Sequence, residues 1–185
     1  MEISKTPLSG VLMLRPRVFK DGRGWFQETY NREKFFAAGI LENFVQDNHS
    51  RSARHTLRGL HYQSRPGQAK LVRCTLGEIW DVAVDIRSDS PTFGRHFGVR
   101  LTQEDPSQIM IPLGFAHGFL VLSDWAEVQY KCSSVYNAAT ESGIQWDDPD
   151  LAVAWPLEGS SPLISDRDKH NPSFRDYRSG PPPVY

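Results

Sequence analysis

The sequence predicts an all-β protein, folded as a sandwich or a barrel and carrying few short helices. Many short apolar runs are separated by Gly, Pro and Asp turns along the 185 residues, and only one segment has a clear helical pattern. This combination is typical of antiparallel sandwiches and barrels rather than of alternating α/β folds. The length fits one domain, and no boundary for a second domain is visible.

The first half of the chain contains three strand patterns and the helix. The strands are expected at residues 10–19, 24–30 and 42–50. Pro16 interrupts the first of them, which makes it an edge strand or a bent one. The helix covers residues 32–38, with Asn31 as its N-cap and Gly39 as its stop.

Two pairs of long strands dominate the second half. Residues 70–76 and 79–87 are predicted to form a hairpin around Gly77 and Glu78, and residues 117–123 and 126–136 a second pair. Further strands are expected at residues 95–102 and 107–112. The chain becomes rich in loops after residue 136, and the Pro-rich end predicts an extended tail from about residue 170.

The strand at residues 79–87 has one apolar and one partly acidic face. The apolar face carries Trp80, Val82, Val84 and Ile86, and the other carries Asp81, Ala83 and Asp85. The acidic face could meet solvent, or it could line the polar, ligand-holding lumen of a barrel. The pattern leaves both arrangements open.

Charge and cysteine usage restrict the class of partner and the compartment. The formal net charge of −1 provides no global basic field for nucleic acid. We expect no membrane partner, because no run of 18 apolar residues occurs and the start lacks a signal-peptide pattern. Cys74 and Cys132 are too few for a disulfide scaffold, so a reduced, cytoplasmic protein is expected.

A histidine lies beside basic residues in the stretch RGLHYQSRPGQAKLVR. His61 is close in sequence to Arg58 and Lys70, and cationic neighbours suit a site that stabilises developing negative charge. Arg58 and His61 would face opposite sides of an ideal strand, so a shared site requires a bend, which Gly59 permits. His61 could still be a metal ligand, a core histidine or a general base.

A second histidine lies in a short motif of the cupin barrels. Pro112, Gly114 and His117 match its Pro-x-Gly-x-x-His pattern. A cupin metal site also needs a His-x-His and a Glu, but His61 is followed by a tyrosine and a glutamine. We therefore expect no bound metal.

Longer motifs extend this likeness from about Gly10 to Asp168. They are DGRGWFQETY, FVQDNHSRS, LRGLHYQ, GQAKLVRCTLGEIWDVAVDIRSDSPTFG, IPLGFAHGF, YKCSSVYN and SDRD. Together they resemble the dTDP-4-dehydrorhamnose 3,5-epimerase family. The resemblance implies a cupin-type β-barrel (jelly roll), a single epimerase domain over residues 1–185, and a homodimer in which the N-terminal strand region reaches across the interface.

The resemblance also implies four catalytic residues and no cofactor. His61 would be the general base, paired with Asp168, and would remove protons made acidic by the neighbouring keto group. Lys70 would face the enolate oxygen, and Tyr130 would return a proton from the opposite ring face.

Ten further positions are expected to bind the dTDP-sugar substrate. They are Arg23, Glu28, Gln46, Asp47, Asn48, Arg58, His117, Tyr136, Glu141 and Arg167. The amides could pair with the thymine edge, the guanidinium groups of Arg58 and Arg167 suit the diphosphate, and Tyr136 could stack on the base.

The expected reaction is inversion of carbons 3 and 5 of dTDP-4-dehydro-6-deoxy-D-glucose, giving dTDP-4-dehydro-L-rhamnose for dTDP-L-rhamnose biosynthesis. A relative that inverts only one carbon is the main alternative, because the same base and acid serve both centres. A metal-dependent cupin enzyme and a non-catalytic nucleotide-sugar-binding cupin are the alternatives from other classes.

Overall fold

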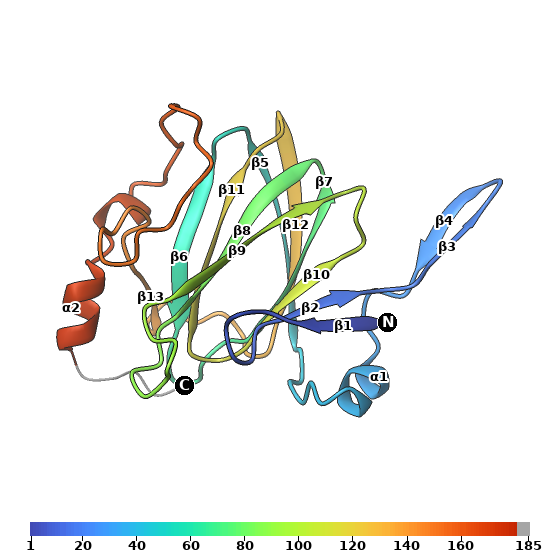
Figure 1. Ribbon diagram of the computed structural model, residues 1–185, viewed down its shortest axis with the longest axis horizontal. Helices are drawn as coiled ribbons and strands as arrows, with labels where there is room; N and C mark the ends of the chain where they lie inside the picture. Colours follow the sequence, from blue (N-terminus) through green and yellow to red (C-terminus); the bar gives the residue numbers. More distant parts are fainter. Residues whose placement is uncertain (181–185) are drawn as a thin grey trace.

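Two antiparallel β-sheets face each other in the computed structural model, which describes residues 1–180 (Figure 1). The six-stranded sheet has the order β1 (Glu2–Lys5), β2 (Leu12–Arg15), β10 (Gln108–Ile111), β7 (Lys70–Leu76), β12 (Trp125–Cys132) and β5 (Gln46–Ala53). The five-stranded sheet has the order β13 (Glu141–Gly143), β6 (Leu57–Gln63), β11 (Phe115–Val121), β8 (Glu78–Asp85) and β9 (His96–Thr102). The predicted all-β barrel of jelly-roll type is confirmed.

The two predicted strand pairs are present as strands but are not paired with each other. β7 lies between β10 and β12, whereas β8 lies between β11 and β9 in the other sheet. β11 and β12 are divided between the sheets in the same way. Gly77 permits the first crossing, because its φ is +70° and a Cβ there would lie 2.1 Å from the Trp125 oxygen. The prediction of two hairpins was therefore wrong, because each connection crosses from one sheet to the other.

The inner face of β8 decides between the two arrangements left open for its acidic residues. Ile79 and Ala83 point into the apolar cluster between the sheets, and Asp81 and Asp85 are fully buried. Val82 and its apolar neighbours on the other face pack under the C-terminal segment. The acidic face is therefore enclosed by protein and does not meet solvent.

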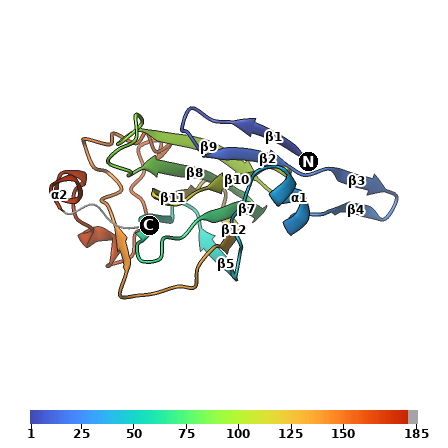
Figure 2. The same cartoon turned by 90° about the horizontal axis from the view of Figure 1, so that it is seen from below.

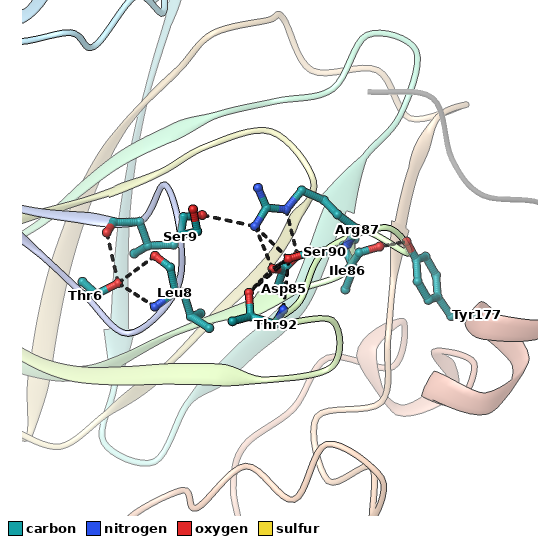
Figure 3. Close-up of polar contacts among 10 residues, drawn as sticks. Thr6, Leu8, Ser9, Asp85, Ile86, Arg87, Ser90, Thr92 and Tyr177 are labelled. Atoms are coloured by element: carbon teal, nitrogen blue, oxygen red, sulfur yellow. Dashed lines mark hydrogen bonds and ion pairs between the residues drawn. The ribbon is translucent and has the colours of Figure 1, made fainter.

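Asp85 closes one end of the barrel through a polar network (Figure 3). Its carboxylate accepts hydrogen bonds from Arg87 at 2.7 Å, Ser90 at 2.6 Å and Thr92 at 2.5 Å. Arg87 also donates to the Ser9 carbonyl, at 3.1 Å. The network joins the end of β8 to the turn that follows it and to the loop after β1.

The predicted helix is α1 (Arg32–Ala37), and Asn31 caps it by accepting from the Lys34 N–H. Its buried residue Phe35 packs on the outer face of the six-stranded sheet, together with Leu71 and Met110. The N-cap and the stop at Gly39, which has a φ of +83°, agree with the prediction.

The C-terminal segment differs from the extended tail predicted from about residue 170. It forms a 3-10 turn, η1 (Asp168–His170), and a helix, α2 (Phe174–Ser179), which starts with a capping box at Ser173. Phe174 is buried in the cluster behind β8, and Tyr177 donates to the Ile86 carbonyl (Figure 3). The tail of residues 181–185 lies outside the described residues.

A two-stranded hairpin projects from the barrel at the end opposite α2 (Figures 1 and 2). It consists of β3 (Val18–Asp21) and β4 (Gly24–Gln27). Its aromatic residues are largely exposed in the single chain: Phe19 at 50%, Trp25 at 64% and Phe26 at 69%. Within residues 1–180, no helix is long and apolar enough to cross a membrane.

Candidate active site

His61 and Asp168 form a direct pair although 107 residues separate them. His61 Nε2 lies 2.6 Å from Asp168 Oδ1, and the Gly59 N–H donates to the other carboxylate oxygen at 3.4 Å. His61 comes from β6, and Asp168 comes from η1, which packs against that strand. The segment after residue 163 therefore delivers a carboxylate to a strand of the barrel.

Two glycines shape the strands beneath this pair. Gly59 has a φ of +134°, and a Cβ there would lie 2.5 Å from Gly118 Cα on β11. The register between β6 and β11 shifts at this point, between His117 and Phe119. The irregularity allows Arg58 and His61 to line the same cavity, as the bend expected at Gly59 requires.

The pair is electrostatically suited to proton transfer. Burial raises the pKa of the Asp168 carboxyl, but hydrogen bonding and charge from His61, with the Gly59 and Ser165 contacts, outweigh it and hold the pKa below its usual value. Asp168 is thus a carboxylate at neutral pH. A neutral His61 that donates Nε2–H to it carries its lone pair on Nδ1, which leaves that nitrogen to accept a proton.

The cavity beside the pair has a volume of about 460 Å³ and is lined by Arg58, His61, Arg167 and Asp168, among others. Arg58 is held by a hydrogen bond from its Nε to Ser52 Oγ, at 3.1 Å. Two guanidinium groups at the mouth of a cavity suit an anionic ligand such as a diphosphate.

A second buried histidine–carboxylate pair lies next to the first. His117 is opposite His61 in the β11–β6 register, and its Nε2 is 2.8 Å from Asp81 Oδ2. Burial lowers the pKa of His117, so the ring is neutral and donates to Asp81. Asp81 was singled out in the sequence only by strand parity, and the structure places it beside the predicted sugar-site residue His117.

Lys70 and Tyr130 come from the facing six-stranded sheet. Lys70 opens β7, and burial lowers its pKa, an effect opposed by Cys132, Glu141 and Asp81. Burial raises the pKa of the Tyr130 phenol, which therefore stays protonated at neutral pH and can donate. A partly buried cation and a protonated phenol thus face a histidine–carboxylate pair across the barrel.

The nucleotide-site candidates Tyr136 and Glu141 both interact with Arg167, which lines the cavity. Arg167 Nη1 is 2.5 Å from the Glu141 carboxylate, and the Tyr136 hydroxyl also raises the pKa of Arg167. The Tyr136 ring is exposed, while its backbone N–H donates to Gln46 Oε1 at 2.8 Å. Gln46 in turn donates to Asn48 at 3.0 Å.

Gln63 was not predicted from the sequence, and it holds the loop that carries Tyr136. Gln63 is buried, donates to Ser134 Oγ at 3.1 Å and the Val135 carbonyl at 3.2 Å, and accepts from the Asn137 N–H at 3.0 Å. Its position in the RGLHYQ motif, two residues after His61, was the available signal.

Of the ten expected binding residues, Arg58 and Arg167 line this cavity, and three others lie well outside it within one chain. Arg23 is on the projecting hairpin, pairs with Asp21 and has 92% of its side chain exposed. Glu28 pairs with Lys34 near the base of that hairpin. Asp47 points to the outer face of the six-stranded sheet, where it pairs with Lys131.

The arrangement can perform proton chemistry next to an anionic ligand. It combines a histidine with an orienting carboxylate, a cation, a phenol and two guanidinium groups. No group of three or more His, Cys, Asp or Glu side chains placed to hold a metal ion occurs in residues 1–180.

Comparisons with known proteins agree with this chemistry. A family model described as dTDP-4-dehydrorhamnose 3,5-epimerase matches residues 5–176. A protein named dTDP-4-dehydrorhamnose 3,5-epimerase from Pseudomonas aeruginosa is 51% identical over 177 residues, covering 95% of this chain and 97% of its own length.

Two solved structures extend the comparison to bound ligands. A dTDP-6-deoxy-D-glucose-3,5-epimerase from Legionella pneumophila, in complex with dTDP-4-keto-L-rhamnose, is 42% identical with a TM-score of 0.92, covering 100% of this chain and 98% of its own. A 3'-monoepimerase from Streptomyces bikiniensis, in complex with dTDP-quinovose, is 38% identical with a TM-score of 0.84, covering 91% and 87% of the two chains.

Proposed function

Because the chain belongs to the dTDP-4-dehydrorhamnose 3,5-epimerase family, we propose that His61 and Asp168 form the base of its reaction. The enzyme is an isomerase of dTDP-rhamnose biosynthesis, acting on dTDP-4-dehydro-6-deoxy-D-glucose and yielding dTDP-4-dehydro-L-rhamnose. The observation that carries the proposal is the 2.6 Å contact between His61 and a carboxylate held ionised, inside a cavity with two arginines.

The first step is removal of the proton on a carbon next to the keto group. His61 Nδ1 accepts this proton, and the ring becomes an imidazolium whose Nε2–H remains bonded to Asp168. The adjacent carboxylate stabilises the new positive charge and fixes the ring orientation. The electron pair of the broken C–H bond moves to the keto oxygen, which forms an enolate.

The second step is return of a proton to the opposite face of the sugar ring. Lys70 stabilises the enolate oxygen as a fixed cation, which lowers the barrier because the charge is larger in the transition state than in the substrate. Tyr130 donates the proton that inverts the carbon, and the raised pKa of its phenol keeps that proton available at neutral pH. The chemistry requires no cofactor.

The dTDP group is bound outside the reacting centre in this proposal. Arg58 and Arg167 contact the diphosphate, His117 lines the sugar pocket, and Tyr136 stacks on the base with Gln46 and Asn48 near the thymine edge. The relative from Legionella pneumophila, with its bound dTDP-4-keto-L-rhamnose, supports a site for a dTDP-sugar.

A homodimer would complete the site in our proposal. The projecting hairpin exposes Phe19, Trp25 and Phe26, and it carries Arg23 away from the cavity of its own chain. In a dimer these residues could reach the cavity of the partner, and Glu28 lies at the base of the same hairpin. Light scattering should give the mass of a dimer, and a monomer at micromolar concentration would contradict this part. We also propose a cytoplasmic location, with which the free, buried Cys74 and Cys132 are compatible.

A single-carbon epimerase is the second candidate, favoured by the likeness to the 3'-monoepimerase from Streptomyces bikiniensis. Both candidates use the same base, cation and acid. Proton NMR of the product distinguishes them, because it reports the configuration at carbons 3 and 5 separately.

The direct test is incubation with dTDP-4-dehydro-6-deoxy-D-glucose, coupled to the reductase that consumes the L-sugar product. Wild-type enzyme should support nicotinamide oxidation by the reductase, and His61→Asn should not. Retained binding of dTDP by His61→Asn, measured by calorimetry, would show that the variant is folded. An active His61→Asn would refute the proposed base.

A further inference from the structure

Asp81 is a fully buried carboxylate on the inner face of β8. One oxygen, Oδ2, accepts the hydrogen bond from His117 Nε2 at 2.8 Å. The other, Oδ1, is buried without a hydrogen-bond partner among the described residues. An unpartnered buried carboxylate oxygen costs free energy, so a role in the site would explain why the position is acidic.

Lys70 is the cation whose charge this carboxylate can stabilise. Lys70 shares its strand face with Val72 and Cys74, which point into the interior between the sheets. Its β10 neighbour in the register, Ile111, is apolar. Lys70 forms no ion pair with a carboxylate of residues 1–180, and burial lowers its pKa. An ammonium in such a place needs negative charge nearby to remain protonated.

Three acidic groups oppose the effect of burial on Lys70: Cys132, Glu141 and Asp81. Burial raises the pKa of the Cys132 thiol to about 11, so it carries no charge at neutral pH. The Glu141 carboxylate is already paired with Arg167 at 2.5 Å.

Of these three groups, Asp81 is the carboxyl group that forms no ion pair with an arginine or lysine of residues 1–180. Its partner His117 is neutral, because burial lowers the pKa of that ring. Lys70 and His61 lower the same pKa further. A neutral His117 therefore does not offset the interaction by which Asp81 opposes the burial of Lys70.

We propose that Asp81 is a positioning residue of the epimerase, holding His117 through one carboxylate oxygen and acting as the counter-charge of Lys70 through the other. This inference rests on the role proposed above for Lys70. It adds a residue of β8 to a site whose proposed catalytic residues come from β6, β7, β12 and η1. The substrate enolate and Asp81 would then both interact with the Lys70 ammonium.

Asp81→Asn tests the charge while keeping the shape. The amide oxygen can still accept from His117, while the amide nitrogen takes the place of Oδ1 and carries no negative charge. Asp85→Asn is the matched control, because Asp85 is also fully buried and lies on the same face of the same strand. Its partners Arg87, Ser90 and Thr92 belong to the network at the end of the barrel (Figure 3).

The readout is the pKa of Lys70 itself, followed by NMR of protein carrying ¹³C-labelled lysine. The Lys70 Cε signal is assigned by its absence from Lys70→Arg. Loss of one nearby opposite charge should lower the Lys70 pKa by about 1 to 3 units in Asp81→Asn. Asp85→Asn should leave that pKa at its wild-type value.

Kinetics provide the second readout. The alkaline limb of kcat/KM should move to lower pH in Asp81→Asn and not in Asp85→Asn, while dTDP affinity stays within about threefold of the wild type. The direction follows from the sign of the effect: without Asp81 the ammonium loses its proton at a lower pH. If Asp81→Asn does not fold, Asp81→Ser is titrated against the same criterion.

A Lys70 pKa in Asp81→Asn equal to that in Asp85→Asn overturns the role of Asp81. Lys70→Ala separates this failure from that of the proposed function. Full activity of Lys70→Ala would refute the role of Lys70 itself, whereas an impaired Lys70→Ala with an unshifted Asp81→Asn would refute only the inference about Asp81.

Discussion

Replacement of Asp168 by Asn removes the charge that faces His61 and keeps the size of the side chain. In the structure, Asp168 Oδ1 lies 2.6 Å from His61 Nε2 and the carboxylate side chain is 4% exposed. The amide can still occupy this place and contact the Gly59 N–H. The variant therefore tests the carboxylate as a stabiliser of the imidazolium that is proposed to form when His61 takes the substrate proton.

The expected loss follows from the electrostatic energy of that ion pair. Taking the charge centres as about 4 Å apart and an effective dielectric constant of about 20, the attraction is about 4 kcal/mol. Because 23% of the His61 side chain is exposed, solvent reduces this value, and we expect a loss of about 3 to 4 kcal/mol. At 1.36 kcal/mol for each factor of ten, kcat should fall by roughly 10²- to 10³-fold.

The assay is the coupled epimerase reaction at saturating dTDP-sugar, with dTDP affinity measured separately by calorimetry. Affinity should change by less than about threefold, because the carboxylate acts on the transition state. Asp166→Asn is the matched control: Asp166 is two residues earlier, has 94% of its side chain exposed and forms an ion pair with Lys169 at the surface. A kcat for Asp168→Asn as high as that of Asp166→Asn would refute the reasoning.

Three further predictions concern other charged or proton-donating groups. Lys70→Ala should lower kcat by roughly two to three decades with a much smaller effect on dTDP affinity; weak dTDP binding as the main defect would place Lys70 in the phosphate site. Tyr130→Phe should exchange substrate protons with solvent without inverting the carbon, and inversion at the wild-type rate would assign the acid to another group. Asp85→Asn should lower the free energy of unfolding by about 3 kcal/mol at neutral pH. Burial raises the pKa of Asp85, but its hydrogen bonds outweigh burial and hold the pKa below the usual 3.8. The difference in unfolding free energy between the variant and the wild type should therefore shrink as the pH falls through the folded-state pKa of Asp85. A difference in urea unfolding that stays constant with pH would contradict this.

Residue patterns predicted the strands better than their partners. The two faces of β8 followed from simple alternation, and Asp81 and Asp85 did prove to lie on one buried face. The predicted pairing of β7 with β8 was wrong, because a single glycine with a positive φ, Gly77, carries the chain from one sheet to the other. Adjacent strands often pair, and nothing local distinguishes a hairpin from a crossing between two sheets.

The site residues were predictable only where they lie in motifs that resemble those of a known family. Residue types alone left His61 with three roles, and its carboxylate partner Asp168 comes from a loop-rich segment that has no strand or helix pattern to place it. The C-terminal helix was missed because its six residues, Phe174–Ser179, are short and depend on packing of Phe174 against the barrel. Gln63 was missed because a buried amide that holds a loop has no sequence pattern of its own.

In the proposed reaction, His61 transfers protons between the substrate and solvent without a cofactor. This transfer can be followed by running the reaction in deuterated buffer with a chelator and without added nicotinamide, and by observing carbons 3 and 5 of the dTDP-sugar by NMR. Wild-type enzyme should return inverted product that carries deuterium at each inverted carbon, and folded His61→Asn should leave both carbons protonated and uninverted. Inverted product without deuterium, or deuterium exchange by His61→Asn at the wild-type rate, would contradict the account.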